Sequence, residues 1–383
     1  MDSSTKKKLS CLMFIPSMGN GGAERVIATL ANVLSEKDYN ITIITITSSE
    51  SFYKLNKSVE IIGMGNFIER KNKLNKYGSL IKSAIQSYLF FNRVIREKKP
   101  DIVLSFLTDT NIISLLSKPF HKTTPFIVSE RAEPNVRNPF YRFLTKFLYP
   151  TADILVCQSN KVAEFFPEYS QKKIKVISNP INEESIPKGL PTERKKVIVG
   201  VGRLFPQKNF DLLIDSFYIL QNDFPEHKLE IYGEGYLRKQ LENKINKMGL
   251  NEKVFLKGIK KDVMKHISDA ELFVMSSNFE GFPNALVEAM ASGLPVISTD
   301  FSTGVARDLV KAENGIIVPV EDKKAMYEAM HKILSSFELR NLMSDNNRGI
   351  IDVLSTNKIV DKWIEAFNEA LTNKPNMERD VNE

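Results

Sequence analysis

Two glutamates, Glu280 and Glu288, flank a Gly-Phe-Pro-Asn turn that stands between two strand-like apolar runs. Two acids this close could form a catalytic pair, a metal-binding pair, or one functional carboxylate beside a structural one. Pro283 suits the first position of a helix, so the N–H groups of residues 284–286 would point toward an anion. Glu280 then lies in the turn before the helix, and Glu288 lies more than one turn inside it. We therefore expect different roles: Glu288 can accept hydrogen bonds from ribose hydroxyls, and Glu280 can reach a sugar ring.

The residues that usually bind metals are dispersed along the chain. There is no D-x-D sequence, and the four histidines are far apart in the sequence. These histidines are His121, His227, His266 and His331. Because metal sites need clustered ligands, we expect neither a metal nor another cofactor.

Two cations follow the first strand-like run of the second half, in "VGVGRLFPQKNFDLLIDSF". Arg203 ends this run, and Lys208 precedes a predicted helix that begins at Asn209. Ligands of parallel sheets bind at the carboxyl ends of the strands, where two fixed cations suit a diphosphate. The alternative is a pair of surface charges without a ligand.

A glycine-rich loop follows the first strand-like run of the chain, in "PSMGNGGAERV". Gly19, Gly21 and Gly22 precede a predicted helix that begins near Ala23. Glycines allow a ligand to approach the backbone, and a helix start favours a phosphate. The loop lacks the glycine spacing of dinucleotide-binding folds and the Lys-Ser/Thr of a P-loop, so a tight structural turn explains it equally well.

Strand-like and helix-like segments alternate through both halves of the chain, which predicts parallel sheets covered by helices. The predicted strands are 8–16, 41–46, 101–107, 125–130, 154–159 and 175–179, then 197–201, 228–232, 254–258, 272–276, 295–299 and 316–320. The predicted helices are 23–34, 77–96, 139–149, 209–220, 237–248, 283–292 and 323–334. The fold class is therefore α/β, with two doubly wound domains.

The chain divides into four predicted segments. A proline-rich stretch after Asn179 reads as a linker, so the domains are residues 1–185 and 186–350. Residues 351–373 form a predicted helix that packs back on the domains, because its apolar residues recur at helical spacing. They are Val360, Trp363, Ile364 and Phe367. The polar tail 374–383 is predicted to be disordered.

Composition points to a cytoplasmic globular protein. The 383 residues exceed one comfortable core, and 42% are hydrophobic against 26% charged. Cys11 and Cys157 both lie in strand-like runs, which argues against a disulfide framework. No apolar run reaches the ~20 residues of a spanning helix. The run after Lys6–Lys8 is too short for a signal peptide.

Positive charge is concentrated in the first half. Residues 1–185 contain 26 Lys and Arg against 17 Asp and Glu, whereas residues 186–383 contain 27 against 29, so the net charges are +9 and −2. The basic half indicates either an anionic partner or a solvated surface. The predicted helix 77–96 can be amphipathic and basic, and could lie on an anionic bilayer or hold a lipid-linked pyrophosphate. The alternative is an ordinary covered helix with basic residues on its wet side.

Taken together, the motifs resemble those of the retaining glycosyltransferases of family four, whose GT-B fold has two facing Rossmann-like domains. The resemblance rests on "GNGGAER", "GRLFPQKN", "IYGEG" and the E-x7-E of "EGFPNALVE", which follow one another in order between about Leu9 and Val320. It implies an acceptor-binding amino-terminal domain and a nucleotide-sugar-binding carboxyl-terminal domain.

The resemblance also assigns roles to single residues. Arg203 and Lys208 match the pair that grips the donor diphosphate. Glu280 matches the acid beside the donor sugar, and Glu288 matches the acid that binds the ribose. The other matching donor-binding positions are Gly21 and Gly22 facing the diphosphate, Ile259 at the base, and Gly281, Phe282 and Asn284 in the turn against sugar and phosphates.

The implied reaction moves a hexose or N-acetylhexosamine from a UDP-sugar to a glycan or lipid-linked saccharide. Arg203, Lys208 and helix starts would replace a metal at the leaving diphosphate. By analogy with the family, attack comes from the same face and the leaving phosphate takes the acceptor proton. Many relatives carry a His after the strand that ends here in Glu130-Arg131, so we assign no acceptor-side acid or base.

The expected location is the cytoplasm, peripheral on the inner face of the membrane, with the acceptor on the basic amino-terminal domain. An alternative enzyme is a nucleotide-sugar epimerase of the same architecture, which would need no acceptor. A non-enzymatic alternative is a nucleic-acid-binding protein, drawn by the basic half. The chain has no recognised motif with interleaved aromatic residues, so no nucleic acid is expected as a partner.

Overall fold

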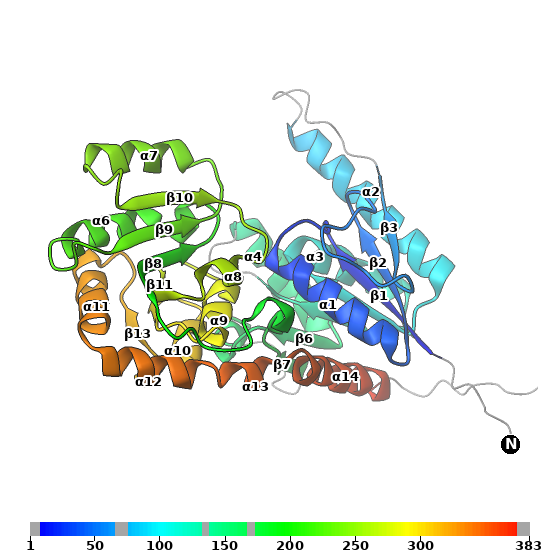
Figure 1. Cartoon of the computed structure of the whole chain (residues 1–383). Coiled ribbons are helices and arrows are strands. Elements are labelled where there is room, and N and C mark those ends of the chain that lie inside the picture. Colours follow the sequence, from blue (N-terminus) through cyan, green and yellow to red (C-terminus); the bar gives the residue numbers. More distant parts are fainter. Residues whose placement is uncertain (1–7, 66–75, 132–137, 167–172, 374–383) are drawn as a thin grey trace, which may run out of the picture. The chain divides into compact units, whose positions relative to one another are not determined.

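The structure is a computed structural model that describes residues 8–65, 76–131, 138–166 and 173–373 (Figure 1). The predicted tail 374–383 lies outside the described residues. The chain divides into two compact units: unit 1 contains Met1–Pro180 and Asn357–Glu383, and unit 2 contains Ile181–Thr356. Among the helices described, none combines the length and the apolar composition needed to cross a bilayer.

Unit 1 is built on a parallel sheet of seven strands in the order β3-β2-β1-β4-β5-β6-β7. The strands are β1 (Leu9–Ile15), β2 (Tyr39–Thr45), β3 (Glu60–Gly63), β4 (Ile102–Phe106), β5 (Phe126–Ser129), β6 (Ile154–Cys157) and β7 (Ile174–Val176). The sequence prediction missed β3, because an edge strand of four residues is too short to show a clear pattern.

Helices cover both faces of this sheet. They are α1 (Gly22–Glu36), α2 (Lys76–Lys98), α3 (Thr108–Ser117), α4 (Pro139–Leu148), α5 (Asn160–Ala163) and α14 (Thr356–Thr372), with short 3-10 turns η2 (Lys118–Phe120) and η4 (Tyr149–Thr151). The helix α3 was not predicted, since its Thr, Ser and Asn residues have low helix propensity. In the structure these side chains are buried, and Ser117 Oγ bonds back to Ile113 O at 3.0 Å.

The two faces of the unit 1 sheet have different covers. Side chains of α2, α3, η4 and α5 pack with one face, in a core that includes Phe14, Phe91 and Phe126. On the other face Trp363 of α14 stacks on Phe106 of β4. The carboxyl-terminal helix, which follows unit 2 in the sequence, thus completes unit 1.

Unit 2 has a parallel sheet of six strands in the order β10-β9-β8-β11-β12-β13. The strands are β8 (Lys195–Val201), β9 (Lys228–Tyr232), β10 (Val254–Gly258), β11 (Ala270–Met275), β12 (Val296–Thr299) and β13 (Gly315–Val318). The helices are α6 (Phe210–Leu220), α7 (Arg238–Lys247), α8 (Val263–Ile267), α9 (Asn284–Ala291), α10 (Val305–Leu309), α11 (Lys323–Ser335), α12 (Phe337–Asn347) and α13 (Ile350–Leu354). Side chains of α6, α7 and α11 share one core with the sheet, and α9 lies against β11 and β12.

The stretch predicted as a linker is partly packed into unit 2. Ile181 is 2% exposed, and its N–H donates to Leu354 O at 3.0 Å. A 3-10 turn, η6 (Glu183–Ser185), follows it. Thr356 N donates to Glu183 Oε1 at 2.8 Å, so the two points where the chain passes between the units are tied together.

Candidate functional site

The strand order of unit 2 reverses direction at the neighbouring strands β8 and β11. From β8 the chain continues to β9 and β10 on one side, while β11 to β13 lie on the other side. In doubly wound sheets, ligands bind where the strand order reverses in this way. The loop after β8 carries Arg203 and Lys208, and the loop after β11 carries Glu280. Topology therefore brings together three of the predicted site residues.

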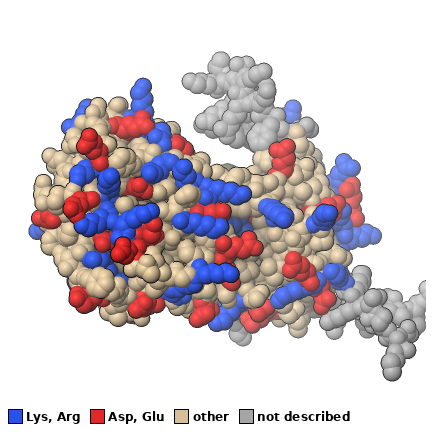
Figure 2. Space-filling model, in the orientation of Figure 1, with Lys and Arg blue, Asp and Glu red and all other residues tan. Residues whose placement is uncertain are grey.

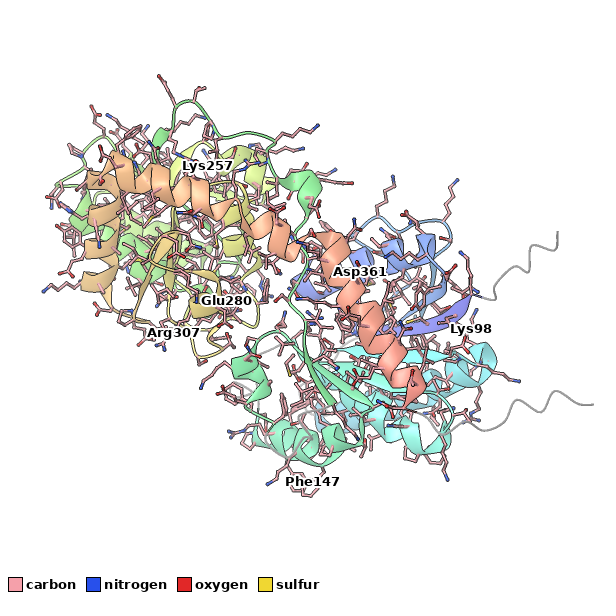
Figure 3. All side chains as sticks on the ribbon, turned by 90° about the horizontal axis from the view of Figure 1, so that it is seen from below. Lys98, Phe147, Lys257, Glu280, Arg307 and Asp361 are labelled. Atoms are coloured by element: carbon pink, nitrogen blue, oxygen red, sulfur yellow. The ribbon has the colours of Figure 1, made fainter. Side chains whose placement is uncertain are left out.

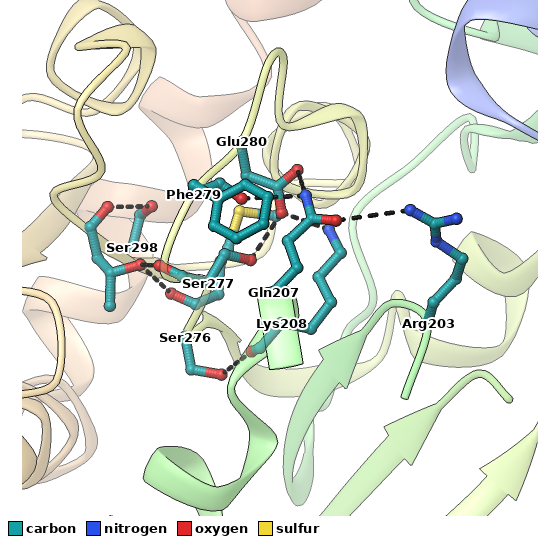
Figure 4. A network of polar contacts seen from close by, with 10 residues as sticks. Arg203, Gln207, Lys208, Ser276, Ser277, Phe279, Glu280 and Ser298 are labelled. Atoms are coloured by element: carbon teal, nitrogen blue, oxygen red, sulfur yellow. Dashed lines mark hydrogen bonds and ion pairs between the residues drawn. The ribbon is translucent and has the colours of Figure 1, made fainter. Parts of the chain in front are cut away.

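A polar network joins these two loops (Figure 4). Lys208 Nζ donates to Glu280 Oε1 at 2.5 Å, and Ser277 Oγ donates to the same oxygen at 2.7 Å. Gln207 Nε2 donates to Glu280 Oε2 at 3.2 Å. On its other side, Gln207 Oε1 lies 3.5 Å from Arg203 Nη2. The network thus runs without interruption from Glu280 to Arg203.

Backbone contacts fix the loops that carry the network. Asn278 N donates to Gln207 O at 2.8 Å, Gln207 Nε2 donates to Phe279 O at 3.0 Å, and Ser276 Oγ donates to Lys208 O at 2.8 Å. Each of these bonds crosses from one loop to the other. The two loops that carry the polar groups are therefore held in place before any ligand arrives.

Asn209 explains how the chain turns from the cations into a helix. It follows the 3-10 turn η7 (Pro206–Lys208) and has φ 43° and ψ 51°, a left-handed conformation that Asn tolerates. Its side chain accepts from Leu212 N and so caps α6. Its side-chain Nδ2 donates to Asn278 Oδ1 at 2.9 Å, which adds a further link to the loop after β11.

Two glycines of "IYGEG" let the loop after β9 approach the loop after β8. Gly233 has φ 146°, and a Cβ atom built on it would lie 1.9 Å from Gly202 O. A Cβ atom on Gly235 would lie 2.4 Å from Leu204 O. Only residues without a Cβ fit here, because the clashes are with backbone atoms. The loop after β9 therefore packs closely on the backbone on both sides of Arg203.

The Lys208–Glu280 pair is largely removed from solvent. The Lys208 and Glu280 side chains are 15% and 7% exposed, whereas Arg203 is exposed. A buried ion pair is favourable only when its remaining lone pairs are also satisfied, as Ser277 and Gln207 do here. An incoming diphosphate would meet Arg203 first and would compete with Glu280 for Lys208.

Glu288 is placed by a different element. It lies in the second turn of α9 and is 8% exposed. The helix begins at Asn284, with Pro283 at the N-cap position rather than at the predicted first helical position. Asn284 N donates to Phe282 O and Leu286 N donates to Pro283 O, both at 3.0 Å. The prediction that these two N–H groups face an anion is therefore wrong, since the turn uses them itself.

The remaining predicted donor-binding positions lie outside the network. Gly281 and Phe282 continue the loop after Glu280, and Phe282 is buried. Ile259 follows β10 and is 68% exposed. Gly21 and Gly22 belong to unit 1, where they start α1 at the carboxyl end of β1. The Glu24 carboxylate lies over Gly21, within 2.2 Å of where a Cβ atom would be, so a side chain at Gly21 would displace that carboxylate.

Glu130 and Arg131, to which we assign no acceptor-side role, are both buried in unit 1. Glu130 is 3% exposed, and its Oε2 accepts from Tyr149 Oη at 2.6 Å and from Thr108 Oγ1 at 3.0 Å. Burial, with Glu130 as a second cause, raises the pKa of Tyr149. The carboxylate thus fastens α3 and η4 to the sheet, a structural role.

Arg131 serves the opposite face of the same sheet. Its guanidinium carbon lies 4.7 Å from the Phe106 ring centre and 5.4 Å from that of Trp363. Nε donates to Ser129 Oγ at 2.7 Å and Nη1 to Asn179 Oδ1 at 2.5 Å. Burial lowers the pKa of this guanidinium. Arg131 therefore anchors α14 to the sheet.

Sequence reasoning missed two members of the network, Gln207 and Ser277. Both belong to stretches that the sequence already marks, "FPQKN" and "MSSNFEG". The available signal was their position at the carboxyl ends of predicted strands. Without the strand order, nothing in the sequence indicates that these two loops are neighbours.

Charges elsewhere on unit 2 are of mixed sign. Figure 2 shows Lys and Arg interspersed with Asp and Glu over the part with β8 to β10. Lys257 and Glu230 form one such pair, at 3.1 Å. Within the described ranges, no three His, Cys, Asp or Glu side chains group as metal ligands would.

Comparisons with known proteins identify the family. Residues 20–185 match the family model described as Glycosyltransferase Family 4, and residues 181–350 match Glycosyl transferases group 1. A Campylobacter jejuni protein named N-acetylgalactosamine-N,N'-diacetylbacillosaminyl-diphospho-undecaprenol 4-alpha-N-acetylgalactosaminyltransferase is 31% identical over 341 residues, which is 86% of this chain and 91% of that protein. A second C. jejuni protein, named GalNAc-alpha-(1->4)-GalNAc-alpha-(1->3)-diNAcBac-PP-undecaprenol alpha-1,4-N-acetyl-D-galactosaminyltransferase, is 28% identical and covers 93% of this chain and 97% of its own.

Solved structures show the same fold. Sucrose-phosphate synthase from Thermosynechococcus elongatus matches with a TM-score of 0.80 at 16% identity, over 95% of this chain and 100% of that one. HepE from Anabaena in complex with UDP matches with a TM-score of 0.75 at 15% identity, over 94% and 99%. The predicted α/β architecture of two Rossmann-like domains, the GT-B fold, is confirmed. The chain belongs to the group 1, family 4 glycosyltransferases.

Proposed function

We propose that this glycosyltransferase moves a hexose or N-acetylhexosamine, with retention, from a UDP-sugar to a lipid-linked saccharide. The observation that carries the proposal is the Arg203–Gln207–Glu280–Lys208 network at the carboxyl ends of β8 and β11. Two relatives whose names describe sugar transfer to undecaprenol-diphosphate-linked saccharides support the acceptor class. The complex of HepE with UDP supports the nucleotide.

The residues of the network have different roles in breaking the sugar–phosphate bond. Arg203, which is exposed, binds the diphosphate first, and Lys208 turns from Glu280 toward the leaving group as negative charge develops there. Glu280 then faces the positive charge that develops on the sugar. Ser277 and Gln207 keep the Glu280 carboxylate oriented throughout. The leaving phosphate takes the proton of the attacking hydroxyl.

A donor panel tests the proposed substrate. The protein is incubated with UDP-, GDP- and ADP-sugars, and thermal stabilisation and sugar release are measured with and without an undecaprenyl-diphosphate saccharide. We expect UDP-sugars alone to stabilise the protein, and transfer only when the acceptor is present. Conversion of the UDP-sugar to its epimer without an acceptor would instead establish the epimerase alternative.

Transfer is expected to be independent of divalent metal. Arg203 and Lys208 supply fixed positive charge beside the leaving group, which is the role that a metal has in other transferases. In excess EDTA the rate should stay within about twofold of the untreated rate. A complete loss of transfer that Mg²⁺ or Mn²⁺ restores would show that the two cations are insufficient.

We also propose that the enzyme acts in the cytoplasm at an anionic membrane surface and binds no nucleic acid. The buried face of α2 includes Phe91, Val94 and Ile95, while Ile85 and Leu89 are 54% and 58% exposed. The net positive charge of residues 1–185 favours attraction to acidic lipid. Salt screens this attraction over a Debye length of about 8 Å. Flotation with anionic liposomes should therefore decrease as salt increases. Equal flotation with neutral liposomes would contradict an electrostatic attraction.

A further inference from the structure

The helix α4 of unit 1 is apolar on more than one side. Tyr141, Leu144 and Leu148 are half-buried, Leu148 packs on the unit 1 core, and α4 contacts α3. These residues supply the ordinary inward face of a surface helix. Three phenylalanines are left over, and their spacing places them together on another side of the helix.

The phenylalanine face consists of Phe140, Phe143 and Phe147, which are 63%, 58% and 60% exposed. The rings of Phe143 and Phe147 lie together, with centres 4.7 Å apart. Figure 3 shows Phe147 at the edge of the molecule, pointing away from the ribbon. A cluster of exposed aromatic rings on one helix is unusual on a soluble surface and indicates a site that is covered in function.

Exposed basic residues lie on the same helix as the phenylalanine face. On α4 itself Arg142 and Lys146, spaced i and i+4, are both exposed. Residues 76–148, which include α2, α3 and α4, contain 12 Lys and Arg against 5 Asp and Glu. The net charge of this segment is thus +7, equal to that of the whole chain. Within this segment Glu130 and Arg131 are both buried, and Glu97 pairs with Arg93 at 2.7 Å. These two acids and two bases therefore leave the net charge unchanged.

Apolar rings beside clustered cations suit one partner, an anionic bilayer. Phenylalanine rings enter the boundary between headgroups and acyl chains, while Lys and Arg remain at the phosphate level. Lysine is depleted in protein–protein interfaces relative to the rest of the surface, so a face flanked by Lys146 suits a protein partner less well. The helices α2, α3 and α4 are consecutive neighbours in one layer, so the cations of α2 lie on the same side of the sheet as the phenylalanine face.

We propose that the phenylalanine face of α4 inserts into the interfacial region of an anionic membrane. This deepens, and rests on, the proposed membrane association: the cations attract the protein to the surface, and the three rings hold it there. The two contributions differ in their response to salt, because burial of apolar surface is not screened. The inserted rings account for the binding that remains at high salt.

The test compares vesicle binding of matched variants. Phe140, Phe143 and Phe147 are changed together to Ser, and Phe143→Ser is compared singly with Phe337→Ser, because Phe337 of unit 2 is 65% exposed. Partition to phosphatidylcholine vesicles with phosphatidylglycerol is measured at low and high salt. The triple variant should bind at least about tenfold more weakly, with the difference greatest at high salt, whereas Phe337→Ser stays within about twofold of the parent.

A fluorescent reporter tests insertion directly. The chain has a single tryptophan, Trp363, and it is fully buried, so its emission gives a constant background. Emission of Phe143→Trp should shift to the blue with anionic vesicles and be quenched by brominated acyl chains. Phe337→Trp should show neither change.

Three results would overturn the proposal in distinguishable ways. If the parent floats with anionic vesicles and the triple variant floats equally, the rings do not insert, although the membrane association stands. If the parent does not float at all, the proposed membrane association fails with it. If the triple variant loses self-association by light scattering while keeping its vesicle binding, the phenylalanine face is an interface between copies of the chain. Donor affinity should be unchanged in every variant, because none of these phenylalanines is a predicted donor-binding residue.

Discussion

Glu280→Gln is expected to lower kcat by about 10²-fold or more and to leave the dissociation constant for the UDP-sugar within about threefold of the parent. In the structure the Glu280 carboxylate is neutralised by Lys208 and held by Ser277 and Gln207. A glutamine can keep part of this hydrogen bonding in the ground state. It cannot offer a negative charge when positive charge develops on the sugar, so the loss appears in the transition state.

Glu288→Gln should have the opposite effect and weaken donor binding more than it lowers kcat. If this buried carboxylate of α9 binds ribose hydroxyls, removing its charge weakens donor binding by about 1.5–3 kcal/mol and changes kcat less. Glu313→Gln is the matched control, because Glu313 is exposed on unit 2. Calorimetry with the UDP-sugar and steady-state rates are measured for all three variants. Identical profiles for Glu280→Gln and Glu288→Gln would refute the division of roles between them.

The sequence was sufficient to predict the placement of Arg203, Lys208 and Glu280, although not the contacts among them. Each of the three comes just after a predicted strand, and parallel strands deliver such residues to one edge of a sheet. Strands such as β8 and β11 of unit 2 were readable because they contain apolar runs bounded by turn residues, as strands covered on both faces do. That Lys208 pairs with Glu280 rather than standing free depends on side-chain conformations that spacing does not determine.

Other features required the tertiary structure. Gln207 and Ser277 are ordinary polar residues until the strand order makes their loops neighbours. The N–H groups of Asn284 and Leu286 are used by the turn, because Pro283 stands one position before the helix and not in it. Likewise the apolar stripe of residues 360–367 indicated a helix that must be covered, and only the fold shows that unit 1 covers it.

Trp363→Ala should destabilise unit 1 by about 3–5 kcal/mol, the cost of emptying a large aromatic site in a core. The indole is fully buried, stacks on Phe106 with ring centres 5.7 Å apart, and covers the guanidinium of Arg131. Its loss leaves a cavity and also exposes one side of a buried cation. Trp363 is thus one of the residues that hold α14, which lies after unit 2 in the sequence, on the sheet of unit 1.

Trp363→Phe separates the packing of Trp363 from its polar group. Among the described residues, the buried indole Nε1 has no hydrogen-bond partner, so replacing the indole removes an unsatisfied donor at the same time as some apolar volume. The two effects oppose one another, and we expect the free energy of unfolding to fall by less than about 1.5 kcal/mol.

Urea unfolding measures the free energy of unfolding of each Trp363 variant, and hydrogen exchange shows which strands lose protection. Peptides from β1 and β4 should lose protection in Trp363→Ala while those from β8 and β11 keep it. Equal loss in both sets would mean that α14 stabilises the whole chain and not unit 1, whereas unchanged protection in β1 and β4 would show that the helix covers a sheet that is stable without it.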